Sequence, residues 1–135
     1  MTPQASGSKP MTAGVWFAVA AGGFLGTEAR YLLGLLFPEL AGAFPWTTLA
    51  VNVAGSLVLG FLTSRWAARP ATPRWFEAGL GPGLVGSFTT FSAVTLALAT
   101  AFPGLLSAGY LGLSLLLGLG AAALGMALGR GGRPA

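Results

Sequence analysis

The chain has 135 residues, of which 54% are apolar and 7% are charged, and its mean hydropathy is +0.76. A soluble domain usually carries about a quarter charged residues, so this composition excludes an ordinary water-soluble fold and predicts an integral membrane protein. The chain has no cysteine and no histidine, which removes disulfides, thiolate chemistry and most acid–base catalysis and argues against an enzyme. The net charge of +4 comes from scattered basic residues, so nucleic acid is not expected as a partner.

Four apolar stretches are long enough to cross a hydrocarbon core, which takes about 20 residues. They run from 15 to 37, from 46 to 63, from 76 to 100 and from 105 to 128. Proline and glycine mark the connections between them. We therefore predict an all-α membrane protein with four transmembrane helices. Its expected organisation is a disordered polar N-terminus at 1–13, a transmembrane domain at 14–128 and a short basic tail at 129–135.

Charge sidedness predicts the orientation of these spans. Four crossings would place both termini and the connection between the second and third spans on one side of the membrane. That side carries Lys9, Arg65, Arg69, Arg74, Arg130 and Arg133. The opposite connections contain Glu39 and no lysine or arginine. The positive-inside rule therefore predicts that both termini are cytoplasmic.

The first span contains an arginine among small residues. Arg30 shares a helical face with Gly22, Gly23, Gly26 and Gly34. A permanently charged guanidinium on such a face is expected to point into protein or water, where it can attract an anion; the alternative is an arginine that snorkels to the interface. Glu28 lies about 200° away around the helix, too far to pair with Arg30. It is expected to be protonated, paired across a subunit interface or near a headgroup.

The second and fourth spans carry polar or small residues with two open interpretations each. The amide of Asn52 can donate to an anion or bridge two helices. Ala121, Gly125 and Gly129 recur every four positions, which indicates close helix contact either within the bundle or between subunits. A four-span bundle of this size has little interior of its own, so a transporter or channel is expected to need a second subunit.

The third span is interrupted by the sequence Gly86-Ser87-Phe88-Thr89-Thr90-Phe91-Ser92. Serine and threonine often bond to a carbonyl one turn earlier and are then harmless in membrane helices. Four hydroxyls within six residues, next to a glycine, favour a different explanation. Lipid tolerates such a cluster only where protein or a water-lined cavity satisfies it, so we predict an ion or solute site here. Tyr110 and Ser114 in the fourth span could continue the hydroxyl track.

Together these segments resemble the Fluc (CrcB) fluoride-specific ion channel family, small four-span bacterial proteins that export fluoride passively. Residues 22–31 match the family's glycine-rich first helix with its arginine. Residues 48–52 match its second-helix asparagine motif, and residues 86–92 match its broken third helix. The resemblance covers residues 14–128, and the three segments in this order and spacing are highly specific.

The resemblance implies a fluoride-selective channel of the bacterial cell (inner) membrane that relieves fluoride toxicity, built as an antiparallel (inverted) dimer in the lipid bilayer with pores at the subunit interface. By position, Arg30 would lie at an aqueous vestibule, and Phe91 would present its electropositive ring edge to fluoride. The implied pore residues are Asn52, Phe91, Thr90, Ser92, Tyr110 and Ser114. The main-chain carbonyls of Gly86 and Thr89 match a structural sodium (Na+) site, whose ion is not transported.

The sequence departs from the family pattern at three positions. Val94 stands where a second pore phenylalanine is usual, Ala97 replaces a carboxylate, and Ser87 replaces a glycine. A homodimer would have to insert in both orientations, whereas the basic residues here all lie on one predicted side. The charge bias, Val94 and Ala97 therefore favour a heterodimer with a homologous subunit over a dual-topology homodimer, and both remain open.

Two other functions remain as alternatives. Glu28 in the first span allows a small multidrug-resistance-type antiporter that exchanges protons for cationic drugs, although Arg30 nearby would repel such cations. The chain could also be a non-conducting partner subunit of a heterodimeric channel, or a structural membrane subunit if its polar groups only join helices.

Overall fold

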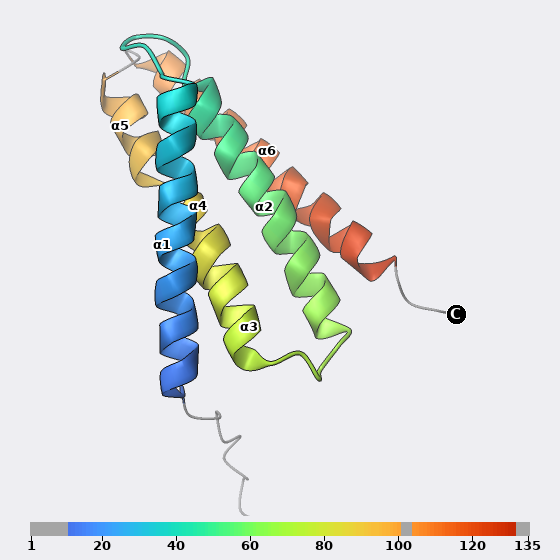
Figure 1. Cartoon of the computed structure of the whole chain (residues 1–135). Helices are drawn as coiled ribbons and strands as arrows, with labels where there is room; N and C mark the ends of the chain where they lie inside the picture. The colour runs from blue at the N-terminus through green and yellow to red at the C-terminus, as the bar shows by residue number, and fades with distance from the viewer. Residues whose placement is uncertain (1–10, 101–103, 132–135) are drawn as a thin grey trace, which may run out of the picture.

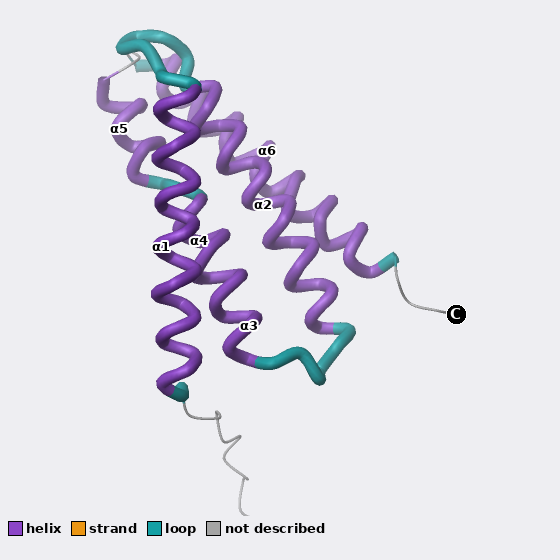
Figure 2. The backbone as a smooth tube through the Cα atoms, in the orientation of Figure 1, coloured by secondary structure: helices purple, strands orange, loops and turns teal. Residues whose placement is uncertain are grey.

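The computed structural model describes residues 11–100 and 104–131, and every regular element within them is helical (Figures 1 and 2). The elements are α1 (Ala13–Leu36), α2 (Trp46–Ala67), α3 (Arg74–Ala78), the π-helix η1 (Gly79–Val85), α4 (Gly86–Phe88), α5 (Ser92–Thr100) and α6 (Leu105–Arg130). The predicted all-helical fold is confirmed. The disorder predicted for the N-terminus falls mainly on residues 1–10, and most of the basic tail falls on 132–135; both lie outside the described residues.

Three segments of the described chain are long and apolar enough to cross a membrane: α2, the composite segment Arg74–Thr100, and α6. They correspond to the second, third and fourth predicted spans. α1 has 24 residues, which is a sufficient length, but it contains Glu28 and Arg30 and is not among the three. The structure therefore supports three of the four expected spans by length and composition.

Proline and threonine set the helix ends. Thr12 caps α1, with its Oγ1 accepting a hydrogen bond from the Val15 N–H at 3.4 Å. α1 ends at Leu36, two residues before Pro38, as expected from the bias of a pre-proline residue away from helical backbone. α2 and α3 each begin directly after a proline, Pro45 and Pro73.

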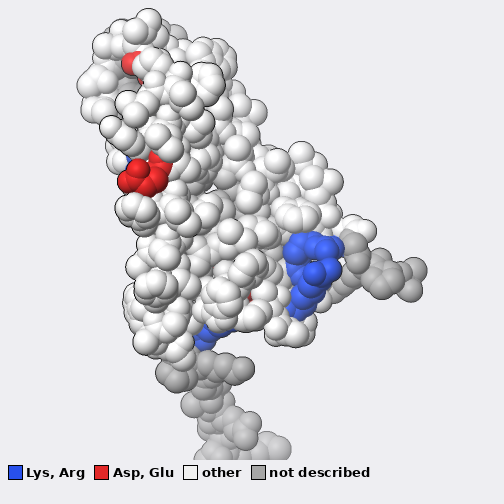
Figure 3. Space-filling view, viewed as in Figure 1, with Lys and Arg blue, Asp and Glu red and all other residues white. Residues whose placement is uncertain are grey.

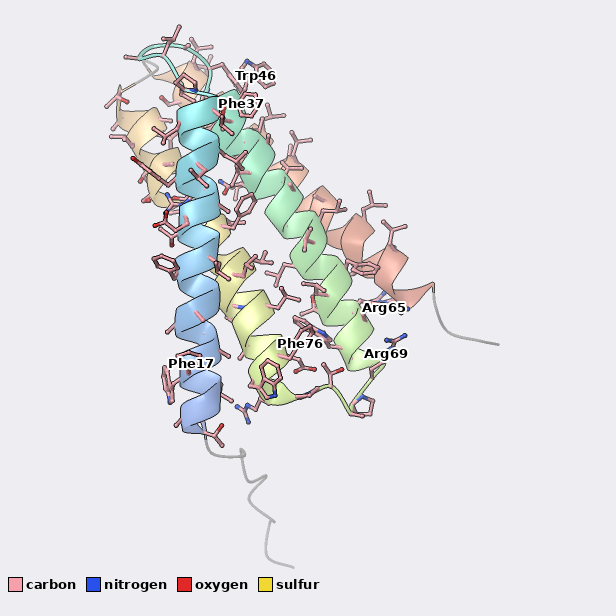
Figure 4. All side chains as sticks on the ribbon, in the orientation of Figure 1. Phe17, Phe37, Trp46, Arg65, Arg69 and Phe76 are labelled. Carbon is pink, nitrogen blue, oxygen red and sulfur yellow. The ribbon has the colours of Figure 1, made fainter. Side chains whose placement is uncertain are left out.

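Successive helices run in opposite directions (Figure 1). The start of α1, the connection from α2 to α3 and the end of α6 lie toward one end of the bundle, and the 37–45 connection lies at the other. Arg65 and Arg69 lie at the first of these ends (Figure 4), where Figure 3 shows basic atoms gathered. Most acidic atoms visible on this face lie toward the opposite end. The charges are thus segregated along the bundle.

α1 packs against the first half of the third segment through two glycines. A Cβ on Gly22 would meet the carbonyl oxygen of Gly79, and one on Gly26 would meet the carbonyl oxygen of Leu84. Both glycines are buried. Only a residue without a side chain allows the two backbones to approach this closely.

η1 widens the third segment around its proline. Pro82 has no N–H and lies inside this helix. The Gly86 N–H bonds to the Gly81 carbonyl five residues earlier, which is the spacing of a π-helical turn. Such turns are frequent at functional sites, and this one directly precedes the polar cluster.

α2 packs along α6 through a second glycine seam. A Cβ on Gly125 would meet the carbonyl oxygen of Leu57, and one on Gly129 would lie 2.7 Å from the carbonyl oxygen of Phe61. Gly60 faces α6 in the same way, against Ala122. Two of the three small residues singled out in the last span, Gly125 and Gly129, thus join helices of one chain.

A small core lies between α2, α5 and α6. Its buried members are Leu49, Val94, Ala97 and Tyr110. Most large apolar side chains elsewhere are exposed, among them Leu105, Leu116 and Leu119 on α6. That distribution fits a protein whose outer surface faces lipid or another subunit.

Candidate functional site: the break between α4 and α5

The third segment loses its helical backbone for three residues. α4 ends at Phe88, Thr89 has an extended backbone with φ −76° and ψ 154°, and α5 begins at Ser92. This interruption lies in the middle of an apolar segment of 27 residues that is otherwise helical. Each backbone polar group released here needs a partner, because an unpaired group is costly in an apolar surrounding.

Asn52 supplies two of these partners. Its Nδ2 donates to the Thr90 carbonyl oxygen at 2.9 Å, and its Oδ1 accepts from the Thr90 N–H at 2.8 Å. The side-chain amide therefore pairs with Thr90 as one strand pairs with another, and it joins α2 to the break. A primary amide has two donors and two acceptor lone pairs, so one N–H of Asn52 is not used by Thr90.

Arg30 and Thr90 satisfy further groups around the break. The Arg30 Nε donates to the Ser87 carbonyl oxygen at 3.3 Å, which brings α1 to the same place. The Thr90 Oγ1 accepts from the Ala93 N–H at 3.3 Å and lies 3.0 Å from the Ser92 Oγ. Side chains from α1, α2 and the break itself thus replace the backbone bonds that a continuous helix would make.

The carbonyls of Gly86 and Thr89 are released from helical bonding. In a continuous helix they would accept from Thr90 and Ala93, but those N–H groups bond to Asn52 and to the Thr90 hydroxyl. The Gly86 oxygen instead accepts from the Thr89 hydroxyl at 3.3 Å. No hydrogen bond to the Thr89 carbonyl is found within the described residues. Two main-chain oxygens next to each other in sequence space are therefore available to a hard cation, which prefers oxygen ligands.

Two hollows meet at Thr90. The first has a volume of about 400 Å³ and is lined by Thr27, Arg30, Tyr31, Gly34, Leu35, Phe37, Glu39, Thr47, Thr48, Val51, Thr90 and Ala93. The second has a volume of about 230 Å³ and is lined by Asn52, Gly55, Ser56, Leu59, Thr89, Thr90 and Phe91. The Asn52–Thr90 pair lies where the two hollows adjoin.

Phe91 and Ser92 lie on the outer surface of the chain. The Phe91 side chain is 67% exposed although it is large and apolar, and Ser92 is also exposed. The second hollow is therefore open on the side of Phe91. A single chain presents this surface without covering it.

Tyr110 and Ser114, predicted as part of the same hydroxyl track, lie apart from the break. Tyr110 is 2% exposed, its ring meets Phe44 edge to face with centroids 5.3 Å apart, and its hydroxyl interacts with Ser114. Neither residue lines the two hollows described above. The structure thus brings Arg30, Asn52 and the 86–92 cluster together and leaves the α6 hydroxyls in the core.

Val94 and Ala97, the two departures from the family pattern, are buried in that core. They are 3% and 9% exposed and pack with Leu49 and Tyr110. A phenylalanine at position 94 would need more room than this core gives. Both departures therefore fit the chain's own packing, which weakens the sequence-based argument that they mark a lost pore.

Sequence reasoning missed two contributors to this region. A Cβ on Gly55 would meet the Cγ2 of Thr89, so Gly55 leaves room for the break against α2. Glu39, which served only as a charge count, accepts hydrogen bonds from both the N–H and the Oγ1 of Thr48. The position of Gly55 one helical turn after Asn52 was an available signal; nothing local pointed to the contact of Glu39.

The fold and the break define a small helical membrane protein with a polar site inside one apolar segment. The family model described as "CrcB-like protein, Camphor Resistance (CrcB)" matches residues 17–126, and the chain belongs to this family. The resemblance seen in the sequence is thereby confirmed.

Three curated relatives have the name fluoride-specific ion channel FluC. The one from Agrobacterium fabrum is 42% identical over 117 residues, which cover 83% of this chain and 93% of the relative. FluC 1 from Symbiobacterium thermophilum is 42% identical over 121 residues, covering 86% and 98%. FluC 2 from Geobacillus kaustophilus is 43% identical over 82 residues, and there the match spans 60% of this chain and 64% of the relative.

Proposed function

We propose that the chain is a subunit of a fluoride-selective channel that passively exports fluoride from the cytoplasm and so relieves fluoride toxicity. The names of the relatives support the permeant ion. One observation on this chain carries the proposal: the Asn52 amide holds Thr90 at the meeting point of two hollows, with Arg30 on one side and Phe91 on the other.

The chemistry of these side chains suits a small, strongly hydrated anion. Arg30 would attract fluoride into the larger hollow, because its charge is permanent. Fluoride must then exchange water for donors, and the remaining Asn52 N–H and the hydroxyls of Thr90 and Ser92 can provide them. The ring edge of Phe91 is electropositive and would face the ion without binding it strongly enough to hold it.

A second subunit would complete the passage. Phe91 and Ser92 lie uncovered on the surface of this chain, and the smaller hollow opens beside them. We propose an antiparallel dimer, with either a second copy or a homologous chain, in which the partner closes this side. Tyr110 and Ser114 would contribute hydroxyls only if the partner or a helix movement exposes them.

A structural sodium ion would fit at the break. The Gly86 and Thr89 carbonyls are the candidate ligands, because both are released from helical bonding, and the partner subunit would supply the remaining oxygens. A bound cation would fix the two breaks against each other and is not the transported species. Exchange of sodium for a large organic cation should silence flux or weaken the dimer; unchanged activity would count against the site.

We further propose that α1 also spans the cell membrane, giving four crossings with both termini cytoplasmic. Its two charged residues fit this location differently, because Arg30 bonds inside the protein whereas Glu28 is exposed. Reporter fusions at the C-terminus test the orientation. A cytoplasmic signal alone is expected, and equal cytoplasmic and periplasmic signals would instead indicate dual topology.

The antiporter interpretation gains no support from the geometry, since Glu28 lines neither hollow at the break. Fluoride efflux from liposomes that contain the purified chain, with or without a co-expressed homologous subunit, tests the proposal. We expect fluoride to leave rapidly and chloride to remain. Equal passage of both ions would contradict the selectivity, and proton-coupled cation flux would favour the antiporter.

A further inference from the structure

The start of α2 is closed by a carboxylate from outside the helix. A helix leaves its first N–H groups without internal partners, and Pro45, the residue before α2, provides no side-chain cap. Glu39, in the connection from α1, fills this role: its Oε1 accepts from the Thr48 N–H at 2.7 Å and its Oε2 accepts from the Thr48 Oγ1 at 2.9 Å. The carboxylate thus uses both oxygens on one residue.

Thr48 has no other partner for these donors in the structure. It is 8% exposed, and its hydroxyl and N–H both point to Glu39. Glu39 and Arg30 line the same hollow, yet no ion pair joins them within the part of the chain that the structure describes. The charge of Glu39 is therefore balanced by the N-terminus of α2, whose aligned peptide dipoles favour a negative charge.

A helix N-terminus with free N–H and hydroxyl donors binds soluble anions. In this chain such a group would face the 400 Å³ hollow, through which fluoride is proposed to pass. An anion held there would slow the passage of the next, and these donors would accept chloride as well as fluoride. The position is already filled by an anion that is part of the chain.

We propose that Glu39 is a tethered anion that occupies the N-terminus of α2 and keeps the hollow from becoming a halide-binding site. Glu39 is thus a positioning and specificity residue of the entrance, and the inference rests on the proposed function for its effect on transport. Its removal would convert the Thr48 donors into a site for free halide.

The test compares Glu39→Ala with Glu28→Ala, which removes the same charge from an exposed carboxylate that has no contact with Thr48. Thermal unfolding of the detergent-solubilised full chain is measured against rising sodium chloride and sodium fluoride. Glu39→Ala should unfold at a lower temperature than wild type without halide and recover as halide binds, because a ligand of the native state stabilises it. Wild type and Glu28→Ala should show no such recovery.

In liposomes, Glu39→Ala should saturate at about tenfold lower fluoride and be inhibited by chloride, since two donors become available to a free anion. If Glu39→Ala does not fold, Glu39→Gln replaces it, because the amide keeps the size of the side chain but cannot accept from both donors. Halide responses equal to those of wild type and Glu28→Ala would overturn the proposal. A chain without fluoride flux would contradict the proposed function, while the unfolding experiment would still decide the role of Glu39.

Discussion

Two regions where α2 meets its neighbours are built in opposite ways. Along α6 the contact is made by glycines, with Gly125 and Gly129 lying against the carbonyl oxygens of Leu57 and Phe61. At the break the contact is made by side-chain hydrogen bonds, chiefly from Asn52 to Thr90. The first arrangement fixes the distance between two intact helices. The second holds open a backbone that no longer bonds to itself.

This difference separates stability from transport. A methyl group added to the glycine seam has nowhere to go, so its cost falls on the folded state. A change at Asn52 or Phe91 alters the groups that an ion would meet, while the helices keep their contacts. The following predictions test this separation, beginning with the largest expected effect on flux.

Asn52→Asp should reduce fluoride efflux by at least about hundredfold. A carboxylate would replace the donor to the Thr90 carbonyl, and its charge would repel fluoride by about 4 kcal/mol at a separation of about 4 Å and an effective dielectric of about 20. The measurement is electrode-detected efflux from liposomes at equal protein load. Efflux within a few-fold of wild type would remove Asn52 from the pathway.

Phe91→Ile should reduce fluoride efflux by about tenfold, because an aliphatic side chain of similar bulk has no electropositive edge. The ring is 67% exposed in the single chain, so its loss should leave the unfolding temperature unchanged. Phe17→Ile is the matched control, since that ring is also exposed and lies far along α1 from the break (Figure 4). Equal efflux from the two variants would exclude a specific role for Phe91.

Gly55→Ala should reduce efflux several-fold, because the new methyl group would meet the Cγ2 of Thr89 and displace the break. Thr89→Ser in the same chain should restore efflux: it removes that methyl group and keeps the hydroxyl that bonds to Val85 and Gly86. A double-mutant cycle measured on fluoride efflux gives the coupling. Additive effects would show that Gly55 acts elsewhere.

Gly125→Ala should have the smallest effect on efflux per folded molecule and should lower the free energy of unfolding by about 1–3 kcal/mol through overpacking. Gly120→Ala on the same helix is the control, because a Cβ there would have no neighbour within 4 Å. Thermal unfolding in detergent compares them. Similar unfolding temperatures would mean that the α2–α6 seam is looser than the structure indicates.

Helix positions could be predicted because they depend on local signals. Apolar length, Pro38, Pro45 and the Arg69-Pro70 turn predict where helices begin and end, and the observed bounds of α1 and α6 differ from the predicted ones by one or two residues. α2 extends to Ala67, four residues beyond its predicted end, because Arg65 sits in the last helical turn where its side chain reaches past the apolar segment.

The site could be located but not assembled from sequence. Hydroxyls beside Gly86 in an apolar segment violate the solvent preference of lipid, and that violation is visible in the sequence. The partner of Thr90 is Asn52, 38 residues away, and the choice between an anion donor and a helix bridge depends on that distant contact. Helical spacing likewise linked Tyr110 to Ser114 but could not predict that Tyr110 faces the core.

The most direct test of the central claim compares Asn52→Leu with Gly125→Ala in two assays on the same preparations, fluoride efflux and thermal unfolding. Leucine at position 52 removes the bonds to Thr90 without adding charge. The account predicts that Asn52→Leu loses most of its efflux and more of it than Gly125→Ala, whereas Gly125→Ala conducts as wild type at a lower unfolding temperature. Parallel losses of efflux and stability in both variants would contradict the separation of scaffold and passage.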